Sequence, residues 1–212
     1  LTASTPLATV AVRALAEQLT RWEAAAAEAR AGAPPAIKAV RAAARRGRAA
    51  LEMFRPALKK KRARRLRAHF KAAEDALAAV RDWDVLIAAA DEVALMEDWP
   101  FLTDWRAQRQ TALSGAARWL DGDEAAALRA DWADFVTDPP AKRKGDARLG
   151  EAAAALFSER VEQLREQAAD LDPANLESYH ALRRLAVKRV RFLVEFLLPA
   201  LGEPGEALLR QL

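Results

Sequence analysis

The feature that most constrains this chain is a basic segment that occurs twice, 143 residues apart. The first copy runs from Arg41 to Leu58 and the second from Arg184 to Leu201. Basic residues, one glutamate and a Pro-Ala-Leu tripeptide keep the same spacing in both copies. The matched positions are Arg45 and Lys188, Arg46 and Arg189, Arg48 and Arg191, Glu52 and Glu195, and Pro56-Ala57-Leu58 and Pro199-Ala200-Leu201. A duplication of this kind predicts a fold of two related halves, each with the same stripe of positive charge.

The prolines and the apolar periodicity divide the chain into helices, and no segment shows the alternation of a β-strand. We expect Pro56 and Pro199 to end helices, because proline disfavours helix continuation. The expected helices cover about residues 6–31, 35–55, 58–80, 82–95, 103–120, 124–136, 148–170 and 175–198. The chain is therefore predicted to be one all-α domain, a helical bundle of two pseudo-symmetric four-helix halves. The first repeat covers 1–97, an acidic helical insertion with a basic loop covers 98–147, and the second, truncated repeat covers 148–212.

Charge is unevenly distributed along the chain. Charged residues make up 30% of the sequence and the formal net charge is only +4. Between Arg41 and Lys71, however, 13 basic residues stand against a single acid, Glu52. The acids gather elsewhere, at 82–104 and 121–138. This segregation indicates a polyanionic partner for one surface of the molecule.

Three of the expected helices each carry a row of cations on one face, given a rotation of about 100° per residue. The rows are Lys38, Arg41, Arg45 and Arg48; Lys60, Arg64, Arg67 and Lys71; and Arg184, Lys188 and Arg191. Apolar residues occupy other faces, namely Val40, Ala44, Leu51 and Phe54 on the second helix and Leu66, Phe70 and Leu77 on the third. Helix surfaces usually place acids one turn from bases, but only Glu52 and Glu195 enter these rows. We therefore expect the rows to bind an anion, and to converge on one concave surface with Arg45 and Lys188 as symmetry mates.

These same residues carry a family resemblance. The pattern Lys38-x-x-Arg41-x-x-x-Arg45-Arg46-x-Arg48, followed by Arg81-Asp82-Trp83-Asp84-Val85, resembles the CHAD domain (conserved histidine α-helical domain). The segment from Lys188 to Glu195 is similar to that family's second repeat. The resemblance implies two four-helix halves related by a pseudo-twofold axis, with basic residues lining a central pore or cavity. It also implies binding of inorganic polyphosphate and association with polyphosphate granules in the cytoplasm. The sequence departs from the family at the histidine positions, which Lys38 and Ala181 occupy.

Together these observations predict inorganic polyphosphate as the partner. The predicted polyphosphate-binding residues are Lys38, Arg41, Arg45, Arg46, Arg48, Lys60, Arg64, Arg67, Lys71, His180, Arg183, Arg184, Lys188, Arg189 and Arg191. Two alternatives stay open, a nucleic-acid-binding module that uses the same helices and an accessory domain to a triphosphatase-type phosphohydrolase. Because replacing a row cation relieves like-charge repulsion, we expect Arg45→Ala and Lys188→Ala not to reduce stability.

Other functions find little support in the sequence. The absence of cysteine excludes disulfides and thiolate chemistry, and two histidines leave few ligands for a transition metal. We expect no cofactor, no metal and no catalytic residues, since the chain has no Gly-rich phosphate loop, no nucleophile motif and no acid–base pair at defined spacing. No apolar run approaches the length of a membrane span, so we expect no membrane partner.

Several single features have both a functional and a structural interpretation. Asp82 and Asp84 suit a Mg²⁺ site, but a helix cap and a pair with an arginine of the adjacent basic helix are favoured. His69 lies off the cationic face, so no binding role is expected for it. The tryptophans are expected to pack in the core rather than to stack on bases. The basic loop at 142–144 is a candidate mobile arm of the anion site.

Overall fold

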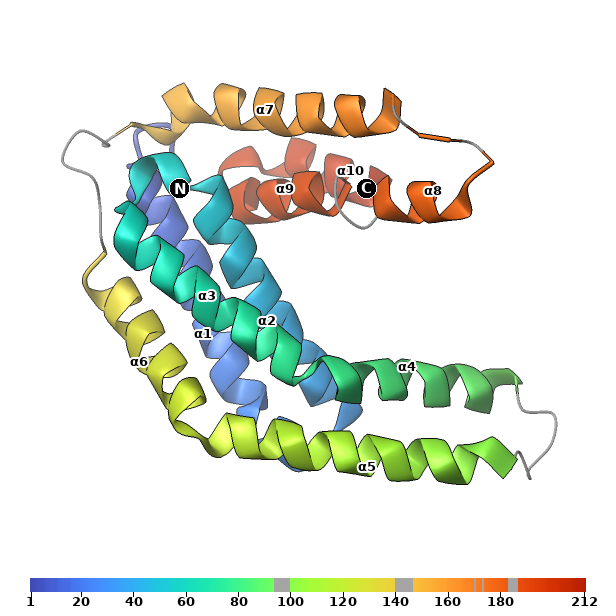
Figure 1. Ribbon diagram of the computed structural model, residues 1–212. Helices are drawn as coiled ribbons and strands as arrows, with labels where there is room; N and C mark the ends of the chain where they lie inside the picture. The colour runs from blue at the N-terminus through green and yellow to red at the C-terminus, as the bar shows by residue number, and fades with distance from the viewer. Residues whose placement is uncertain (94–99, 140–146, 170, 173, 183–186) are drawn as a thin grey trace. The chain divides into compact units, whose positions relative to one another are not determined.

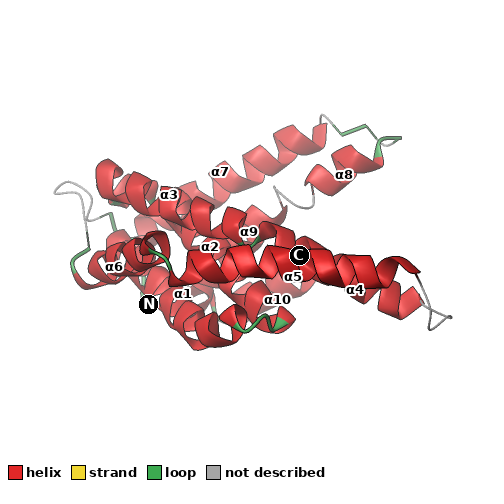
Figure 2. Cartoon of the chain, turned by 60° about the horizontal axis from the view of Figure 1, so that its bottom comes forward, coloured by secondary structure: helices red, strands yellow, loops and turns green. Residues whose placement is uncertain are grey.

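The computed structural model describes residues 1–93, 100–139, 147–169, 171–172, 174–182 and 187–212. Within these ranges the secondary structure is helical and contains no strand, as Figure 2 shows. An isolated bridge joins Pro6 to Arg148. The prediction of an all-α fold is confirmed. Over the same ranges, no helix has the length and apolar character that crossing a membrane requires.

The described residues form ten α-helices and one short 3-10 helix (Figure 1). In chain order they are α1 (Leu7–Arg30), α2 (Pro34–Met53), η1 (Arg55–Ala57), α3 (Lys60–Ala76), α4 (Ala78–Val93), α5 (Pro100–Asp121), α6 (Asp123–Thr137), α7 (Leu149–Ala169), α8 (Leu176–Leu182), α9 (Lys188–Leu201) and α10 (Glu203–Gln211). Adding the offset of 143 to the first residue of α3 gives the first residue of α10. These two helices therefore begin at positions that the sequence repeat relates.

Two expected helix boundaries are wrong. Pro199 lies inside α9, which continues to Leu201 and ends at Gly202 with a positive φ of 58°. Proline has no N–H and so lacks the hydrogen bond to the carbonyl four residues earlier, and only Ala200 and Leu201 follow Pro199 in this helix. The boundary between α3 and α4 falls at Leu77 rather than after Val80. Asp82 consequently lies within α4 and does not cap it.

The described chain divides into two compact units that do not follow the predicted repeats. Unit 1 comprises Leu1–Ala14, Ala49–Ala63 and Pro139–Leu212, and so combines segments of both repeats. Unit 2 comprises Leu15–Arg48 and Arg64–Asp138, which belong to the first repeat and the acidic insertion.

Unit 2 has an aromatic core. Trp132 of α6 is fully buried, with its ring centroid 4.5 Å from that of Phe70 and 6.0 Å from that of Trp22. Its indole Nε1–H donates to the carbonyl oxygen of Leu15 at 3.1 Å, so its polar atom is satisfied. Trp119 packs edge-on against Trp22 at 6.5 Å. Trp22 and Trp132 are buried in the core, as predicted for the tryptophans, whereas Trp119 is half-buried beside them.

A helical hairpin projects from the same unit. α4 and α5 run side by side along their length, as Figure 1 shows, and α5 leads directly into α6. Asp123 and Glu124 lie in the first turn of α6, where their charges are favourable to the helix dipole. The described part of the acidic insertion is therefore helical, as predicted, and consists of α5 and α6.

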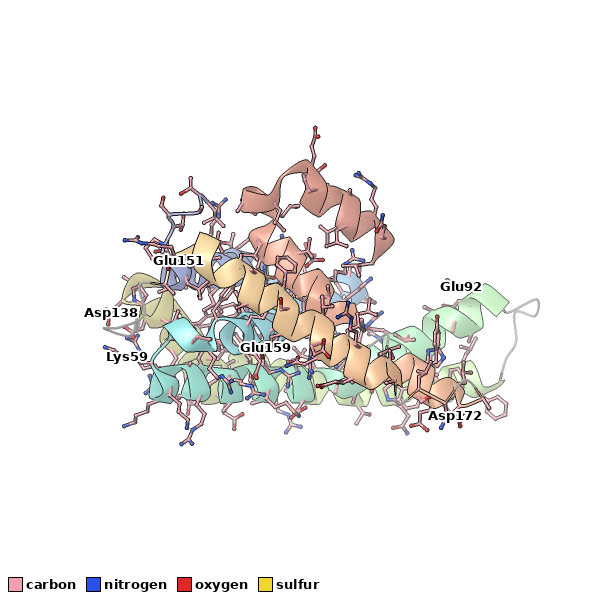
Figure 3. The ribbon with its side chains drawn as sticks, turned by 90° about the horizontal axis from the view of Figure 1, so that it is seen from above. Lys59, Glu92, Asp138, Glu151, Glu159 and Asp172 are labelled. Carbon is pink, nitrogen blue, oxygen red and sulfur yellow. The ribbon has the colours of Figure 1, made fainter. Side chains whose placement is uncertain are left out.

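Unit 1 is built around α9. This helix contacts α7 and α10, and it buries Leu193, Val194 and Leu197. Phe196 packs against Phe54, with ring centroids 6.2 Å apart. The start of the chain is tied to the start of α7, because the Leu149 N–H donates to the Thr5 carbonyl at 2.8 Å. Glu151 and Glu159 lie along α7 (Figure 3), so this helix is acidic where α2 is basic.

Gly47 is conspicuous as a glycine inside α2. A Cβ atom at this position would lie 2.7 Å from Cζ of Phe70, whose ring is fully buried against Trp132. We expect Gly47→Ala to lower the free energy of unfolding, because overpacking costs about 1–3 kcal/mol and exceeds the helix-propensity gain of about 1 kcal/mol.

Equilibrium urea denaturation measures this effect. Gly115→Ala in α5 is the control, because no atom lies within 4 Å of its added Cβ. We expect the control to be neutral or stabilising. A Gly47→Ala protein as stable as the control would contradict the steric explanation.

Candidate anion-binding site

The cationic row of α2 lies at the border between the core of unit 2 and solvent. Val40 and Ala44 are completely buried on the apolar face, as predicted. Lys38 is exposed, and the four arginines Arg41, Arg45, Arg46 and Arg48 are half-buried. A half-buried guanidinium retains charge and donors in a medium that screens less than water, which strengthens its attraction for an anion.

A buried carboxylate accompanies two of these arginines. Glu74 of α3 has a side chain that is 9% exposed, and its Oε1 lies 3.0 Å from Arg48 Nε. Arg48 Nη2 donates to Glu74 Oε2 at 3.3 Å. Arg45 Nε lies 3.6 Å from the same Oε2, too far for a hydrogen bond but close enough for an ion pair. Two of the row cations are therefore already paired with an anion within the protein.

Sequence reasoning missed Glu74 because this residue lies just beyond the basic stretch from Arg41 to Lys71. A signal was present, since Glu74 follows Phe70 by four residues and precedes Leu77 by three. This spacing puts a carboxylate on the apolar face of α3. A charged residue at such a position is seldom buried without a partner, and the nearest cation-rich helix is α2.

Arg41 differs from its neighbours in the row. Its Nε is buried and has no hydrogen-bond partner among the described residues. Burial lowers the pKa of the guanidinium below its ordinary value, and the neighbouring charge of Arg45 lowers it further. Asp82 and Glu74 oppose this shift, while Arg81 adds to it. Arg41 is thus a half-buried cation with one buried donor, Nε, that has no partner among the described residues.

The cations of α3 are more exposed than those of α2. Arg64, Arg67 and Lys71 belong to unit 2 and are exposed. Nitrogen-tipped side chains extend outward along α3 in Figure 3. Lys71 forms an ion pair with Asp75 one turn later, and both side chains are well exposed. Lys60, also exposed, belongs to unit 1.

The remaining predicted site residues belong to unit 1 or lie outside the described residues. Lys188, Arg189 and Arg191 are exposed on α9, and Arg191 Nε donates to Glu195 Oε1 at 3.1 Å. His180 is exposed on α8 beside Tyr179. Arg183, Arg184 and the basic loop at 142–144 fall outside the described residues. That the rows of the two units share one surface stays a prediction.

The repeat does not duplicate every row. At the offset of 143, Lys60 of α3 corresponds to Glu203 of α10, and Arg64 corresponds to Ala207. Three cations of α2, Arg45, Arg46 and Arg48, recur in α9, whereas those at the start of α3 are lost in α10. The start of α3 is therefore basic, whereas the corresponding start of α10 is not.

The paired aspartates of α4 have a structural role. Asp84 is buried, and its Oδ1 accepts a hydrogen bond from Arg109 Nε at 2.7 Å. Arg109 Nη2 also donates to the Gly32 carbonyl at 2.6 Å. The predicted ion pair thus exists, but its arginine comes from α5 and not from the basic helix. Asp82 is exposed on α4, and the described residues contain no group of three metal-ligating side chains.

His69 also has a structural partner. Its Nε2 lies 3.1 Å from Oδ2 of Asp131 on α6, and Arg65 Nη2 donates to Oδ1 of the same aspartate at 2.5 Å. Asp131 therefore joins α3 to α6. That His69 takes no part in anion binding stays a prediction.

Comparison with known proteins identifies the family. The fold is similar to that of PptA from Streptomyces chartreusis, with a TM-score of 0.71 and 18% identity, over 91% of this chain and 75% of that chain. It is equally similar to the CHAD domain from the plant Ricinus communis, with a TM-score of 0.71 and 21% identity, over 92% of this chain and 67% of that one. No curated protein matches. The family model of the CHAD domain matches residues 13–212, and the chain therefore belongs to the CHAD domain family.

Proposed function

We propose that this protein binds inorganic polyphosphate through the cations of α2 and α3 in unit 2. The observation that carries the proposal is Arg41, a half-buried arginine whose Nε has no partner within the described part of the chain. Its charged neighbours are the cations Arg45 and Arg81 and the acids Asp82 and Glu74. An empty protein that holds desolvated like charges together is stabilised by an anion that fits among them. Membership of the CHAD family supports this assignment.

Polyphosphate suits a helical row of this kind better than a compact anion. It carries about one negative charge per phosphate along a flexible chain, so it can follow cations that recur at each helical turn. Arginine adds bidentate contacts to phosphate oxygens. Release of condensed counterions supplies much of the driving force, as it does for nucleic acids.

The side chains between the cations argue against nucleic acid. Binding of single strands uses aromatic side chains that stack on bases. Phe54 and Phe70, the aromatic residues of the basic region, are both fully buried in the core. The exposed surface of α2 and α3 thus offers charge and alanine rather than stacking platforms. We propose a binding module without catalytic activity, which targets the protein to polyphosphate granules.

The test is a titration with polyphosphates of increasing length at two ionic strengths. We expect affinity to rise with length and to fall linearly with the logarithm of salt concentration, because several phosphates are neutralised at once. Single-stranded and duplex DNA at matched charge serve as competitors and should displace long-chain polyphosphate poorly. Equal affinity for orthophosphate and long chains, with little response to salt, would disprove the proposal. Localisation of a fluorescent fusion in cells with and without granules tests the targeting role separately.

A further inference from the structure

We propose that Glu74 is an internal counter-anion that withdraws Arg48 from the polyphosphate site and so limits affinity. The inference rests on the proposed function, because it concerns the ligand of that site. The arginines of the α2 row then differ in whether a carboxylate of the protein neutralises them. Arg48 is neutralised within the protein, whereas Arg41 keeps its charge for the ligand.

The position of the Glu74 carboxylate shows how Arg48 is neutralised within the protein. Both oxygens of Glu74 face Arg48, with Nε 3.0 Å from Oε1 and Nη2 3.3 Å from Oε2. The Oε1 atom is buried without a hydrogen bond, so the Nε contact is mainly electrostatic. The Glu74 side chain is 9% exposed and that of Arg48 is 32% exposed. Salt screens a pair with one buried partner less than it screens a fully exposed pair.

A phosphate cannot readily replace Glu74. Glu74 is 7% exposed and lies on the same face of α3 as the buried Phe70, so a side chain that turned away would lose its contacts with Arg48 and Arg45. A phosphate that reaches Arg48 must approach a negative charge that stays in place. Attraction to the guanidinium and repulsion from the carboxylate then nearly cancel at short range.

The corresponding position of the second copy shows a different arrangement. Arg191 matches Arg48 at the offset of 143, but its partner is Glu195 on its own helix, one turn away. The Arg191 side chain is 48% exposed, and exposed pairs at this spacing are weak and exchange readily with other anions.

The test is the salt dependence of long-chain polyphosphate binding by Glu74→Gln, which preserves the shape of the side chain and removes its charge. We expect the dissociation constant to fall by about threefold to tenfold. The slope of log affinity against log salt should steepen by about 0.7, because one further cation joins the ligand. Asp75→Asn is the matched control, since it makes the same charge change in an exposed ion pair, that of Lys71 and Asp75, whose aspartate is 61% exposed. The control should change affinity less than about twofold.

A second variant, Arg48→Gln/Glu74→Gln, removes both charges of the pair and so leaves neither residue charged without its partner. It keeps the proposal testable if Glu74→Gln alone does not fold. We expect its salt slope to equal that of the wild type. If the slope of the double variant were shallower than that of the wild type by about 0.7, Arg48 would already bind polyphosphate in the wild type. That result would overturn the proposal. An unchanged slope in Glu74→Gln, or an equal effect of Asp75→Asn, would do the same. Wild-type protein that fails to bind long-chain polyphosphate would instead refute the proposed function itself.

Discussion

Replacing Arg109 with leucine is expected to lower the free energy of unfolding by about 3–5 kcal/mol, because it leaves a buried carboxylate without its charged partner. Asp84 is 1% exposed at its side chain, and Arg109 Nε is its partner at 2.7 Å. The same guanidinium satisfies the Gly32 carbonyl, at the C-terminal end of α1. One substitution therefore removes contacts that join α5 to α4 and to the turn after α1.

Arg106→Leu is the matched control for this prediction. Arg106 is also on α5 and pairs with an aspartate of α4, Asp91, at 3.6 Å. Both side chains are more than half exposed, and such pairs contribute only about 0–1 kcal/mol. Urea denaturation of the two variants should separate them clearly. Equal stability loss would mean that burial of Asp84 contributes nothing, and the structural assignment of the aspartates would fail.

Replacing Arg41 with glutamine is expected to weaken long-chain polyphosphate binding by roughly tenfold to a hundredfold. Each charge-assisted hydrogen bond in a desolvated site contributes about 1.5–3 kcal/mol. Glutamine retains much of the length of the side chain and some hydrogen-bonding capacity, but not the charge. Arg118→Gln on α5 is the control, because Arg118 is exposed and lies outside the cationic rows. Isothermal titration at moderate salt measures both affinities.

The same substitution should not reduce stability. The pKa of the Arg41 guanidinium is lower in the folded protein than its ordinary value, chiefly because of burial. A base whose pKa falls on folding destabilises the native state wherever it is charged, which is at every pH below its folded pKa. Glutamine removes that penalty, so the melting temperature should stay constant or rise. A variant that loses stability and binds as tightly as wild type would show that Arg41 is a structural residue.

The sequence predicts that Arg45→Ala and Lys188→Ala do not reduce stability, but the contacts of Arg45 lead us to expect a loss of stability for Arg45→Ala. The prediction from the sequence considered only repulsion between neighbouring arginines of one helix. Arg45 also lies 3.6 Å from the buried Glu74, so its loss leaves the carboxylate less compensated. The row therefore contains arginines with opposite effects on stability, and the difference originates in α3 rather than in α2.

The sequence by itself determined the fold class, the faces of the basic helices and the family. Helical periodicity is a local property, and the apolar positions Val40, Ala44, Leu66 and Phe70 repeat at spacings that indicate one buried stripe on each helix. All four are buried, as expected. The duplicated pattern from Lys38 to Arg48 was sufficient to suggest the CHAD domain, because spacing along a helix is preserved in the folded protein.

Only the tertiary structure decided which charges are paired. The partner of Arg48 is 26 residues away, and that of Arg65 is 66 residues away. The pair of Asp84 and Arg109 depends on how α4 packs against α5. Charge along a sequence says where cations are numerous, but burial and distance decide how strongly each one interacts. Those quantities arise when helices pack, and for this reason neither Glu74 nor the special position of Arg41 followed from the repeat that revealed the site.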